Sequence, residues 1–537
     1  MQNFILSERY KQIIICLLSK SDMNRYISSD QLASEIYLSR STLVKDIKNL
    51  NKYLQYYNLQ IKGVNKLGYI LEGNEINKRL FIINEIFEVF MESLNISEYH
   101  FSRKIEYLIK KSEDHYFIDT KKSDLFKKCL IITVLRCQKG IHITRPIKNY
   151  MNQFQNIEWV EDLKNYIFED YKVNLTRYDT DFLIFPFNLG DFKLSHYYEG
   201  SVSYILDRMI NEIYKEYQFY LDKNFINNEI YTHFIYMINR SIFKSPINIS
   251  IDEKIELNYP FAYQIAKSAC VYLEKELNTH IFYQEIGFLA LYFQLAIRAK
   301  YDAPKIIGII KTPETSMMKI AEDKMREMFK GDCEIIEVNL SDVGSLDISK
   351  CSALISAFPI EEQTNIPVIQ LNNIFDNDYI EKRVDEGQRQ NLIRNINVDY
   401  SPHFVLEDGE ISYETYVFEI LNRMKNEGKV NNDFIKKVID TKKEKFGSDY
   451  TFLPHGVNKK SMKFIVDLNI IYSQEINKVL FITVLGIPEK VEDESNYLIV
   501  QIYDFLFHVI HLLNQASKNQ SIYSILEEIK REGIING

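Results

Sequence analysis

The stretch from residue 29 to residue 73 limits the fold of this chain more than any other part of its sequence. Ser28 or Ser29 can cap a short helix, and Ser39 can cap a longer helix that follows a tight turn. The first helix would bury Leu32, Ile36 and Leu38, and the second would bury Leu43, Ile47, Leu50 and Leu54. The second set recurs at spacings of four, three and four residues, which is one stripe of a helix with about 3.6 residues per turn.

Two short alternating runs follow the second helix. Leu59–Ile61 and Tyr69–Leu71 alternate like strands, and we expect Gly63 and Gly68 at the bends of a hairpin. An earlier helix at about residues 7–20 would complete the core with Ile13, Ile14, Leu17 and Leu18. Together these elements predict a winged helix-turn-helix, an arrangement that binds duplex DNA.

The apolar stripe of the second helix leaves donor-rich side chains on its other faces, and such side chains reach base edges and phosphates. The candidate DNA-binding residues are Arg40, Ser41, Thr42, Lys45, Lys48, Asn49 and Lys52. Residues 1–75 hold ten Lys and Arg against seven Asp and Glu, whereas the whole chain has a net charge of −9. A basic head on an acidic body suits DNA contact at one end. The alternative is an ordinary helical hairpin with a solvated basic face, which the wing and the uneven charge disfavour.

The composition sets the class of protein. With 537 residues and 46% hydrophobic side chains, the chain can form about three to five domains with real cores. It has no run of 18 apolar residues and no signal-peptide pattern, so we expect a cytoplasmic protein. The six cysteines are scattered without a CxxC pair, which favours reduced thiols over disulfides or a metal site. P-loop, GxGxxG, HExxH and GxSxG motifs are absent, so we expect neither an enzyme nor a cofactor.

Two segments, at about residues 80–195 and 200–302, share a pattern that indicates an internal repeat. Each contains an apolar helix that ends in Arg, at Cys129–Arg136 and at His233–Arg240. Each later holds an acidic residue that opens another apolar helix, at Asp181–Asn188 and at Glu285–Tyr292. The first and last residues are seven positions apart in every case. We therefore predict two all-α domains of the same kind.

A winged helix-turn-helix followed by two such repeats resembles the transcriptional activators that carry PTS regulation domains (PRDs), where PTS is the sugar phosphotransferase system. These are the BglG/MtlR/LicR-type regulators and the Mga/AtxA-type virulence regulators. The resemblance implies that PRD histidines receive phosphate from PTS phosphocarrier proteins and that this changes dimerisation and activity. His233 stands at the first histidine position of the second PRD and is a phosphorylation candidate. The other reading of His233 is a satisfied, partly buried helix histidine.

The remaining three PRD histidine positions are occupied by other residues. Cys129 and Asn188 stand at the two positions of the first PRD, and Tyr292 stands at the second position of the second PRD. None of the three can become a phosphohistidine, so the resemblance implies phosphorylation of the PRDs at His233 alone.

The last third alternates between strands and helices, which predicts parallel α/β structure. Asp302–Pro304 is a predicted linker. Residues 303–395 then resemble an EIIB domain of the PTS, with predicted strands at Lys305–Ile310, Cys333–Val338, Ala353–Ser356 and Pro367–Gln370. The loop after the first strand lacks the cysteine of catalytic EIIB domains, and Pro313 removes one N–H donor from it. We read this domain as non-catalytic.

Residues 405–537 resemble an EIIA domain of the mannitol/fructose type. The motif that carries the resemblance is Phe452–Gly456, in which His455 stands at the family's phosphorylation position. Ser495 and Asn496 occupy the region of the family's helper histidine. His508 and His511 lie three apart on a predicted helix and lack a third metal ligand, so we read them as helix residues.

The predicted organisation is multidomain and mostly α, with an α/β C-terminal part. A winged helix-turn-helix at 1–75 precedes PRD-like domains at 80–195 and 200–302, an EIIB-like domain at 303–395 and an EIIA-like domain at 405–537. We expect a homodimeric DNA-binding transcriptional regulator, more specifically an activator, which binds double-stranded promoter DNA and is controlled through PTS-like domains. The alternative is a PTS phosphotransferase component that uses the EIIA-like domain. An RNA-binding antiterminator is a third reading, which the helical N-terminus disfavours. Sugar-operon and virulence roles both stay open.

Overall fold

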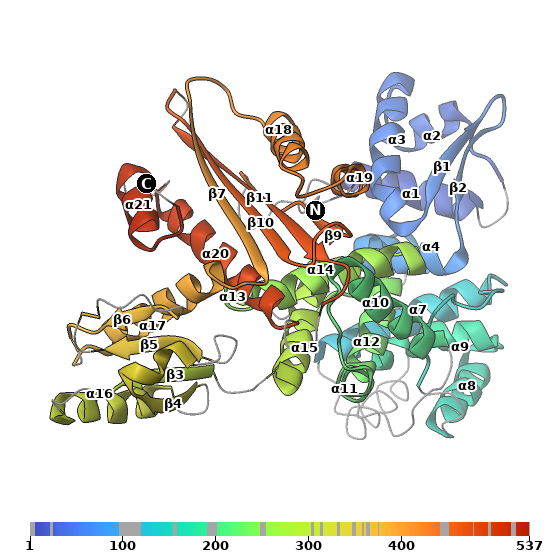
Figure 1. Ribbon diagram of the computed structural model, residues 1–537. Helices are drawn as coiled ribbons and strands as arrows, with labels where there is room; N and C mark the ends of the chain where they lie inside the picture. The colour runs from blue at the N-terminus through green and yellow to red at the C-terminus, as the bar shows by residue number, and fades with distance from the viewer. Residues whose placement is uncertain are drawn as a thin grey trace. The chain divides into compact units, whose positions relative to one another are not determined.

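The computed structural model describes residues 6–21, 25–95, 120–153, 158–190, 201–247, 254–301, 305–311, 315–329, 333–345, 351–356, 359–360, 366–373, 375–440, 450–475, 477–491, 496–516 and 522–535 (Figure 1). The predicted linker at Asp302–Pro304 lies outside these residues. The chain forms two compact units. The first comprises Met1–Val202, Tyr231–Asn248 and Leu277–Phe282, and the second comprises Ser203–Ile230, Ile249–Glu276 and Tyr283–Gly537.

The first unit begins with the predicted winged helix-turn-helix. Its elements are α1 (Glu8–Ser21), α2 (Ser29–Glu35), α3 (Arg40–Leu54), the 3₁₀ turn η1 (Gln55–Tyr57), β1 (Gln60–Val64) and β2 (Gly68–Glu72). Ser28 caps α2 and Ser39 caps α3, because each side chain accepts a hydrogen bond from a backbone N–H of the first turn. The apolar residues predicted for these helices are buried, except for Leu38, which is half-buried.

The hairpin wing differs from the prediction at one of its two glycines. Gly63 lies inside β1, where it pairs with Tyr69, and not at a bend. Gly68 does begin the return strand. Its φ is +108°, a backbone conformation that residues with a side chain rarely adopt. A Cβ atom at Gly68 would lie 2.0 Å from the carbonyl oxygen of Ile27, because Ile27 pairs with Tyr69 through an isolated antiparallel β-bridge. The wing is therefore fixed to the segment that leads into α2.

The rest of the first unit is helical. Its elements are α4 (Glu75–Phe81), the π-helical turn η2 (Ile82–Ile86), α5 (Phe87–Ser93), α7 (Thr120–Gln138), α8 (Glu158–Tyr171), α9 (Arg177–Ile184), the 3₁₀ turn η4 (Phe185–Asn188) and α12 (Tyr231–Ile242). One apolar core runs from Leu6 to Leu189 and includes Phe243. The predicted helices Cys129–Arg136 and His233–Arg240 form parts of α7 and α12.

One helix start in this unit differs from the prediction. Asp181 lies in the middle of α9 and does not open it. The helix begins at Arg177 because Thr176 and Asp179 form a reciprocal capping box, in which each side chain bonds the backbone N–H of the other. This capping pair, whose N-cap residue Thr176 lies five positions before Asp181, was not recognised in the sequence.

The second unit begins with the helices α10 (Ser201–Tyr217), α11 (Lys223–Glu229), α13 (Lys254–Asn258), α14 (Pro260–Leu277) and α15 (Tyr283–Tyr301). Glu285 lies in the first turn of α15, as predicted, and is fully buried. Within the described part of the chain, no helix combines the length and the apolar character that a membrane span requires.

A four-stranded parallel sheet follows, with the strand order β4-β3-β5-β6. Its elements are β3 (Lys305–Ile310), α16 (Thr315–Met328), β4 (Cys333–Val338), the 3₁₀ turn η5 (Leu340–Ser345), β5 (Cys351–Ser356), β6 (Val368–Gln370) and α17 (Asn377–Ile393). All three strand pairings are parallel, as the alternation of strands and helices predicts. Apolar clusters cover the two faces of the sheet, which is the usual state of a parallel sheet.

The C-terminal part of the second unit is a mixed sheet (Figure 1). Its elements are β7 (Val398–Glu407), α18 (Tyr413–Asn426), α19 (Asn432–Asp440), β8 (Thr451–Phe452), β9 (His455–Asn458), β10 (Phe464–Ser473), β11 (Lys478–Pro488), α20 (Leu498–Ala516) and α21 (Ile522–Arg531). Strand β10 lies between antiparallel β11 and parallel β7 and is buried along its whole length. Parallel pairing with β11 holds β9, so the first residue of this strand, His455, has a fixed position.

We expect Gly68→Ala to destabilise the DNA-binding head. The added methyl group would meet the backbone of Ile27, and alanine would adopt a positive φ at a cost of about 1–2 kcal/mol before any clash is counted. Protease sensitivity of the wing, measured on the full-length protein, should rise. Gly409→Ala is the control, because no atom lies within 4 Å of a Cβ there. Equal protease resistance of the two variants would contradict the close approach at Ile27.

Candidate functional site

The exposed face of α3 carries most of the residues that the sequence suggested for DNA contact. The side chains of Arg40, Ser41, Lys45, Lys48, Asn49 and Lys52 are exposed. Thr42 is half-buried, and its backbone N–H donates to the capping oxygen of Ser39. Val44 is 55% exposed and lies on the same helix face, between Arg40 and Lys48. The face thus combines several donors with one apolar side chain.

One of these residues is already paired within the head. Arg40 forms an ion pair with Asp30 of α2, and both side chains are largely exposed. An exposed ion pair of this kind contributes little to stability, so the guanidinium can exchange Asp30 for a phosphate at small cost. Arg40 is the first residue of α3, so its side chain lies at the N-terminal end of this helix.

Contacts from the rest of the head hold α3 in place. Asn51 accepts a hydrogen bond from the backbone N–H of Ile61 at 2.7 Å and donates one to the Ile61 carbonyl oxygen at 3.0 Å. This pair of bonds ties α3 to strand β1 of the wing. On the buried side, the Asp46 carboxylate receives the Arg9 guanidinium from α1 at 2.9 Å. The helix and the wing therefore present their outer surfaces as one rigid element.

The C-terminal end of α3 meets residues from much later in the chain. Tyr56, in the turn that follows α3, lies under the Lys244 ammonium, 5.0 Å from the ring centroid. The His280 ring lies edge-on to the same tyrosine, with 6.5 Å between the centroids. The neighbouring Tyr57 donates a 2.5 Å hydrogen bond to Glu85 in the π-helical turn. We call Tyr56, Tyr57, Glu85, Lys244 and His280 the tyrosine junction.

A network of buried charges connects α4, α7 and α9. The Arg79 guanidinium is fully buried and contacts Glu75 and Asp179, each at 2.9 Å. Arg136 donates two hydrogen bonds to Glu75, at 2.8 and 2.7 Å. Burial acts to raise the pKa of Glu75, but the two guanidinium groups outweigh it and hold that pKa below its ordinary value. The carboxylates are therefore ionised at neutral pH.

Within the described residues, one group of side chains has the spacing of metal ligands. It consists of Cys137, His142 and Asp179. The Arg79 guanidinium occupies this group, 2.9 Å from Asp179 and 3.6 Å from the Cys137 sulfur. Burial also raises the pKa of the Cys137 thiol to about 12, which disfavours the thiolate that a metal requires. The chemistry of the group therefore fits a buried ion pair better than a metal site.

His233 lies in α12 of the first unit and is half-buried. Arg240, the last residue of the predicted helix His233–Arg240, is almost fully buried and donates to the carbonyl oxygen of Leu189 at 2.6 Å. Cys129 and Asn188 are fully buried, and the Asn188 amide donates to Tyr150. Tyr292 lies in α15 of the second unit, and burial raises its pKa. The described contacts of Arg240 and Asn188 are structural.

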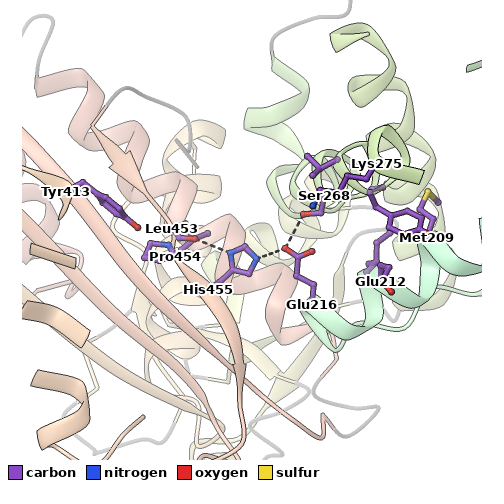
Figure 2. Close-up of a pocket in the computed structure, with 13 residues that line it drawn as sticks. Met209, Glu212, Glu216, Ser268, Lys275, Tyr413, Leu453, Pro454 and His455 are labelled. Atoms are coloured by element: carbon purple, nitrogen blue, oxygen red, sulfur yellow. Dashed lines mark hydrogen bonds and ion pairs between the residues drawn. The ribbon is translucent and has the colours of Figure 1, made fainter. Parts of the chain in front are cut away.

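His455 is almost completely buried at the start of β9, and helix α10 supplies its main contacts (Figure 2). The His455 Nε2 atom lies 3.1 Å from Glu216 Oε1, and its Nδ1 atom lies 3.1 Å from the carbonyl oxygen of Leu453. The Tyr217 ring stacks on the imidazole at 5.0 Å with an interplanar angle of 23°. Ser268 of α14 donates to the same Glu216 oxygen at 3.3 Å.

These contacts favour one protonation state of His455. Two of its partners, a carboxylate and a carbonyl oxygen, are hydrogen-bond acceptors, so the ring can donate to both only when both nitrogens carry hydrogen. The arrangement therefore favours an imidazolium ion paired with a carboxylate. Burial acts to raise the pKa of Glu216, but the hydrogen bond and charge of His455 outweigh it and lower that pKa.

A cavity of about 440 Å³ lies beside this ion pair, within the second unit (Figure 2). Its charged and polar lining includes Glu212, Glu216, Ser268, Lys275 and His455, and Tyr413 contributes from α18. Two carboxylates, one ammonium group and the imidazolium therefore share one half-enclosed space.

His508 has structural contacts, and His511 faces solvent. His508 is half-buried on α20, and its Nε2 atom lies 2.8 Å from the buried Glu532 carboxylate. Arg389 of α17 contacts the same carboxylate at 3.3 Å. His511 is exposed, and Asn496 is buried. Ser495 lies outside the described residues.

Two family comparisons match this chain. The Mga helix-turn-helix domain matches residues 2–85, and the PRD domain matches residues 207–296. The chain therefore carries a Mga-type helix-turn-helix domain and a PRD domain, which confirms the resemblance that the sequence suggested.

The chain is also homologous to two regulators of Bacillus subtilis (strain 168). It is 21% identical over 384 residues to the probable licABCH operon regulator. The aligned region covers 65% of this chain and 58% of that relative. It is 21% identical over 299 residues to the transcriptional regulator ManR, covering 50% of this chain and 44% of the relative. The chain thus spans about half the length of these curated relatives, and both carry the names of regulators and not of enzymes.

Sequence reasoning did not find the residues that surround His455. Glu216 stands 239 positions before His455 in the chain, and Tyr217 and Ser268 are also remote from it in the sequence. No local pattern links them to the Pro-His motif. The hydrogen bonds of Asn51 were also missed, because an asparagine in a helix more often faces solvent. The position of Asn51 could have predicted its hydrogen bonds, because it lies next to the buried stripe of α3 and beside strand β1 of the wing.

We expect Asn51→Ala to weaken DNA binding although it removes no exposed donor. It would break both bonds between α3 and β1, at a cost of about 1–3 kcal/mol to the head, so the wing would lose its fixed angle. DNA affinity by fluorescence anisotropy is the measurement, and Asn49→Ala, on the exposed face, is the comparison. An Asn51→Ala variant with a normally folded head and unchanged affinity would show that the wing makes no contribution.

Proposed function

We propose that this protein is a DNA-binding transcriptional regulator, more specifically an activator, that reads promoter DNA with α3. The carrying observation is the exposed, donor-rich face of α3 within a winged head that matches the Mga helix-turn-helix domain. In this proposal Arg40, Ser41, Thr42, Lys45, Lys48, Asn49 and Lys52 contact base edges and phosphates in the major groove. The wing contacts the DNA backbone.

The same proposal assigns control to the helical and C-terminal domains. The PRD match over residues 207–296 contains His233, which supports this residue as a phosphate acceptor. The parallel sheet β4-β3-β5-β6 supports an EIIB-like domain at 303–395. The described part of the loop after β3 contains no cysteine, so we propose that this domain is non-catalytic. The position of His455 at the start of β9 supports an EIIA-like domain at 405–537. PTS phosphocarrier proteins would deliver phosphate to His233 and His455.

A homodimer completes the proposal, because two heads on adjacent half-sites bind DNA far more strongly than one. A regulator of this kind works where chromosomal DNA lies, which for a bacterial protein is the cytoplasm. Sugar-operon and virulence roles are both compatible with it. The phosphotransferase alternative is not favoured, since both homologous proteins carry the names of regulators.

We expect the double substitution Lys45→Ala and Lys48→Ala to weaken DNA binding at every ionic strength. Each lost phosphate contact should also reduce the slope of log K against log salt by about 0.9, so the double variant should lose about 1.8. The measurement is a salt titration with DNA fragments selected by the wild-type protein from a random pool.

Lys11→Ala is the matched control, because Lys11 lies in the same head but is paired with Glu8 on α1, at 2.7 Å. It should leave the affinity and the salt slope unchanged. If the double variant keeps the wild-type slope, α3 is not the DNA-binding helix. If the wild-type protein selects no DNA at all, the proposed function itself is wrong.

A further inference from the structure

Two elements of the second unit that lie far apart in the sequence meet at His455. Strand β9 contributes the imidazole, and the last turn of α10 contributes the Glu216 carboxylate and the Tyr217 ring. Tyr217 is itself fixed to α14, because its hydroxyl lies 2.8 Å from that of Ser268. The ion pair therefore joins the C-terminal mixed sheet to two helices of the segment that matches the PRD domain.

We propose that His455 and Glu216 form a latch between these parts, and that a phosphoryl group on His455 would open it. This inference rests on the proposed role of His455 as a phosphate acceptor. It adds a partner within the chain, which is Glu216. It also adds a structural consequence of phosphorylation, which is the release of α10 from β9.

The closed latch and phosphorylation exclude each other chemically. In the closed state Nε2 carries a proton and has no lone pair, so it cannot attack phosphorus. This proton must first leave to solvent, and the Glu216 carboxylate, which holds it in place, must move away. The Nε2 lone pair then attacks the phosphorus atom of a donor with a P–N bond, such as a phosphohistidine. That bond breaks, its electron pair stays on the donor nitrogen, and a proton from solvent neutralises that nitrogen.

The product cannot close again. Nδ1 keeps its hydrogen bond to Leu453, but Nε2 now carries a phosphoryl dianion where the Glu216 oxygen lay 3.1 Å away. The ionised Glu216 faces this dianion, and Glu212 in the same cavity adds a second negative charge. Lys275 is the single ammonium among the lining residues. An attractive ion pair thus becomes a repulsive contact, and the end of α10 has no remaining charge partner on β9.

Potassium phosphoramidate tests the latch, because it phosphorylates accessible imidazoles without any protein donor. The full-length wild type, Glu216→Gln, Glu212→Gln and His455→Gln are incubated with it, and phosphorylation of His455 is followed by intact mass and peptide mapping. Glu216→Gln keeps the shape but removes the charge, so His455 should be labelled about fivefold faster, the factor expected for an ion pair of about 1 kcal/mol. Glu212→Gln, one turn earlier on the same helix, should react like the wild type.

Hydrogen exchange reports the opening. Peptides that cover residues 209–217 and 455–458 should exchange faster in phosphorylated wild type than in unphosphorylated wild type, and His455→Gln treated with the reagent should show no further change. If His455 is labelled equally fast in wild type and Glu216→Gln, and exchange does not change, the latch is wrong while the phosphate acceptor stands. If His455 is labelled in none of the proteins that contain it, both the acceptor role and the phosphate-opened latch are wrong. The proposal that the protein binds DNA would still stand.

Discussion

The first unit depends on the ion pairs that the fully buried Arg79 guanidinium forms. The guanidinium holds Glu75 and Asp179, and Arg136 closes the network from the opposite side. Helix α4 begins three residues after the wing strand β2, so this network sets the direction in which the chain leaves the DNA-binding head. A buried ion pair that loses one partner leaves an uncompensated charge at a cost of about 3–5 kcal/mol. The head and the following helices are therefore joined by charge as well as by a shared apolar core.

The sequence predicted those elements whose cause is local. The caps at Ser28 and Ser39, the stripe of α3 and the strands of the parallel sheet follow from residues close together in the chain. The start of α9 was placed incorrectly because a capping box competed with an apolar pattern. The surroundings of His455 could not be predicted, since Glu216 reaches it only through tertiary folding across 239 positions. The motif therefore points to His455 as a candidate, whereas the partners of its ring come from distant positions in the chain.

His233 and His455 have different environments, although both stand at positions that the resemblance assigns to phosphohistidines. His233 is half-buried on α12. Arg240, further along the same helix, donates a hydrogen bond to the Leu189 carbonyl oxygen. His455 is enclosed by a carboxylate, a carbonyl oxygen and an aromatic ring. In the proposed latch, a histidine held in an ion pair is protected until its carboxylate moves. If His455 accepts phosphate, its reactivity would therefore depend on conformation as well as on the presence of a phosphate donor.

The tyrosine junction has a consequence for how such a chain can be divided and recombined. Lys244 and His280 contact Tyr56 directly after α3, so the surroundings of that helix are completed by residues about 190 and 220 positions downstream in the printed sequence. A chimera that joins residues 1–75 to an unrelated body would leave one face of Tyr56 open to water. Exchange of DNA-binding heads between regulators of this architecture therefore requires these downstream residues to be transferred with the head, as a discontinuous module.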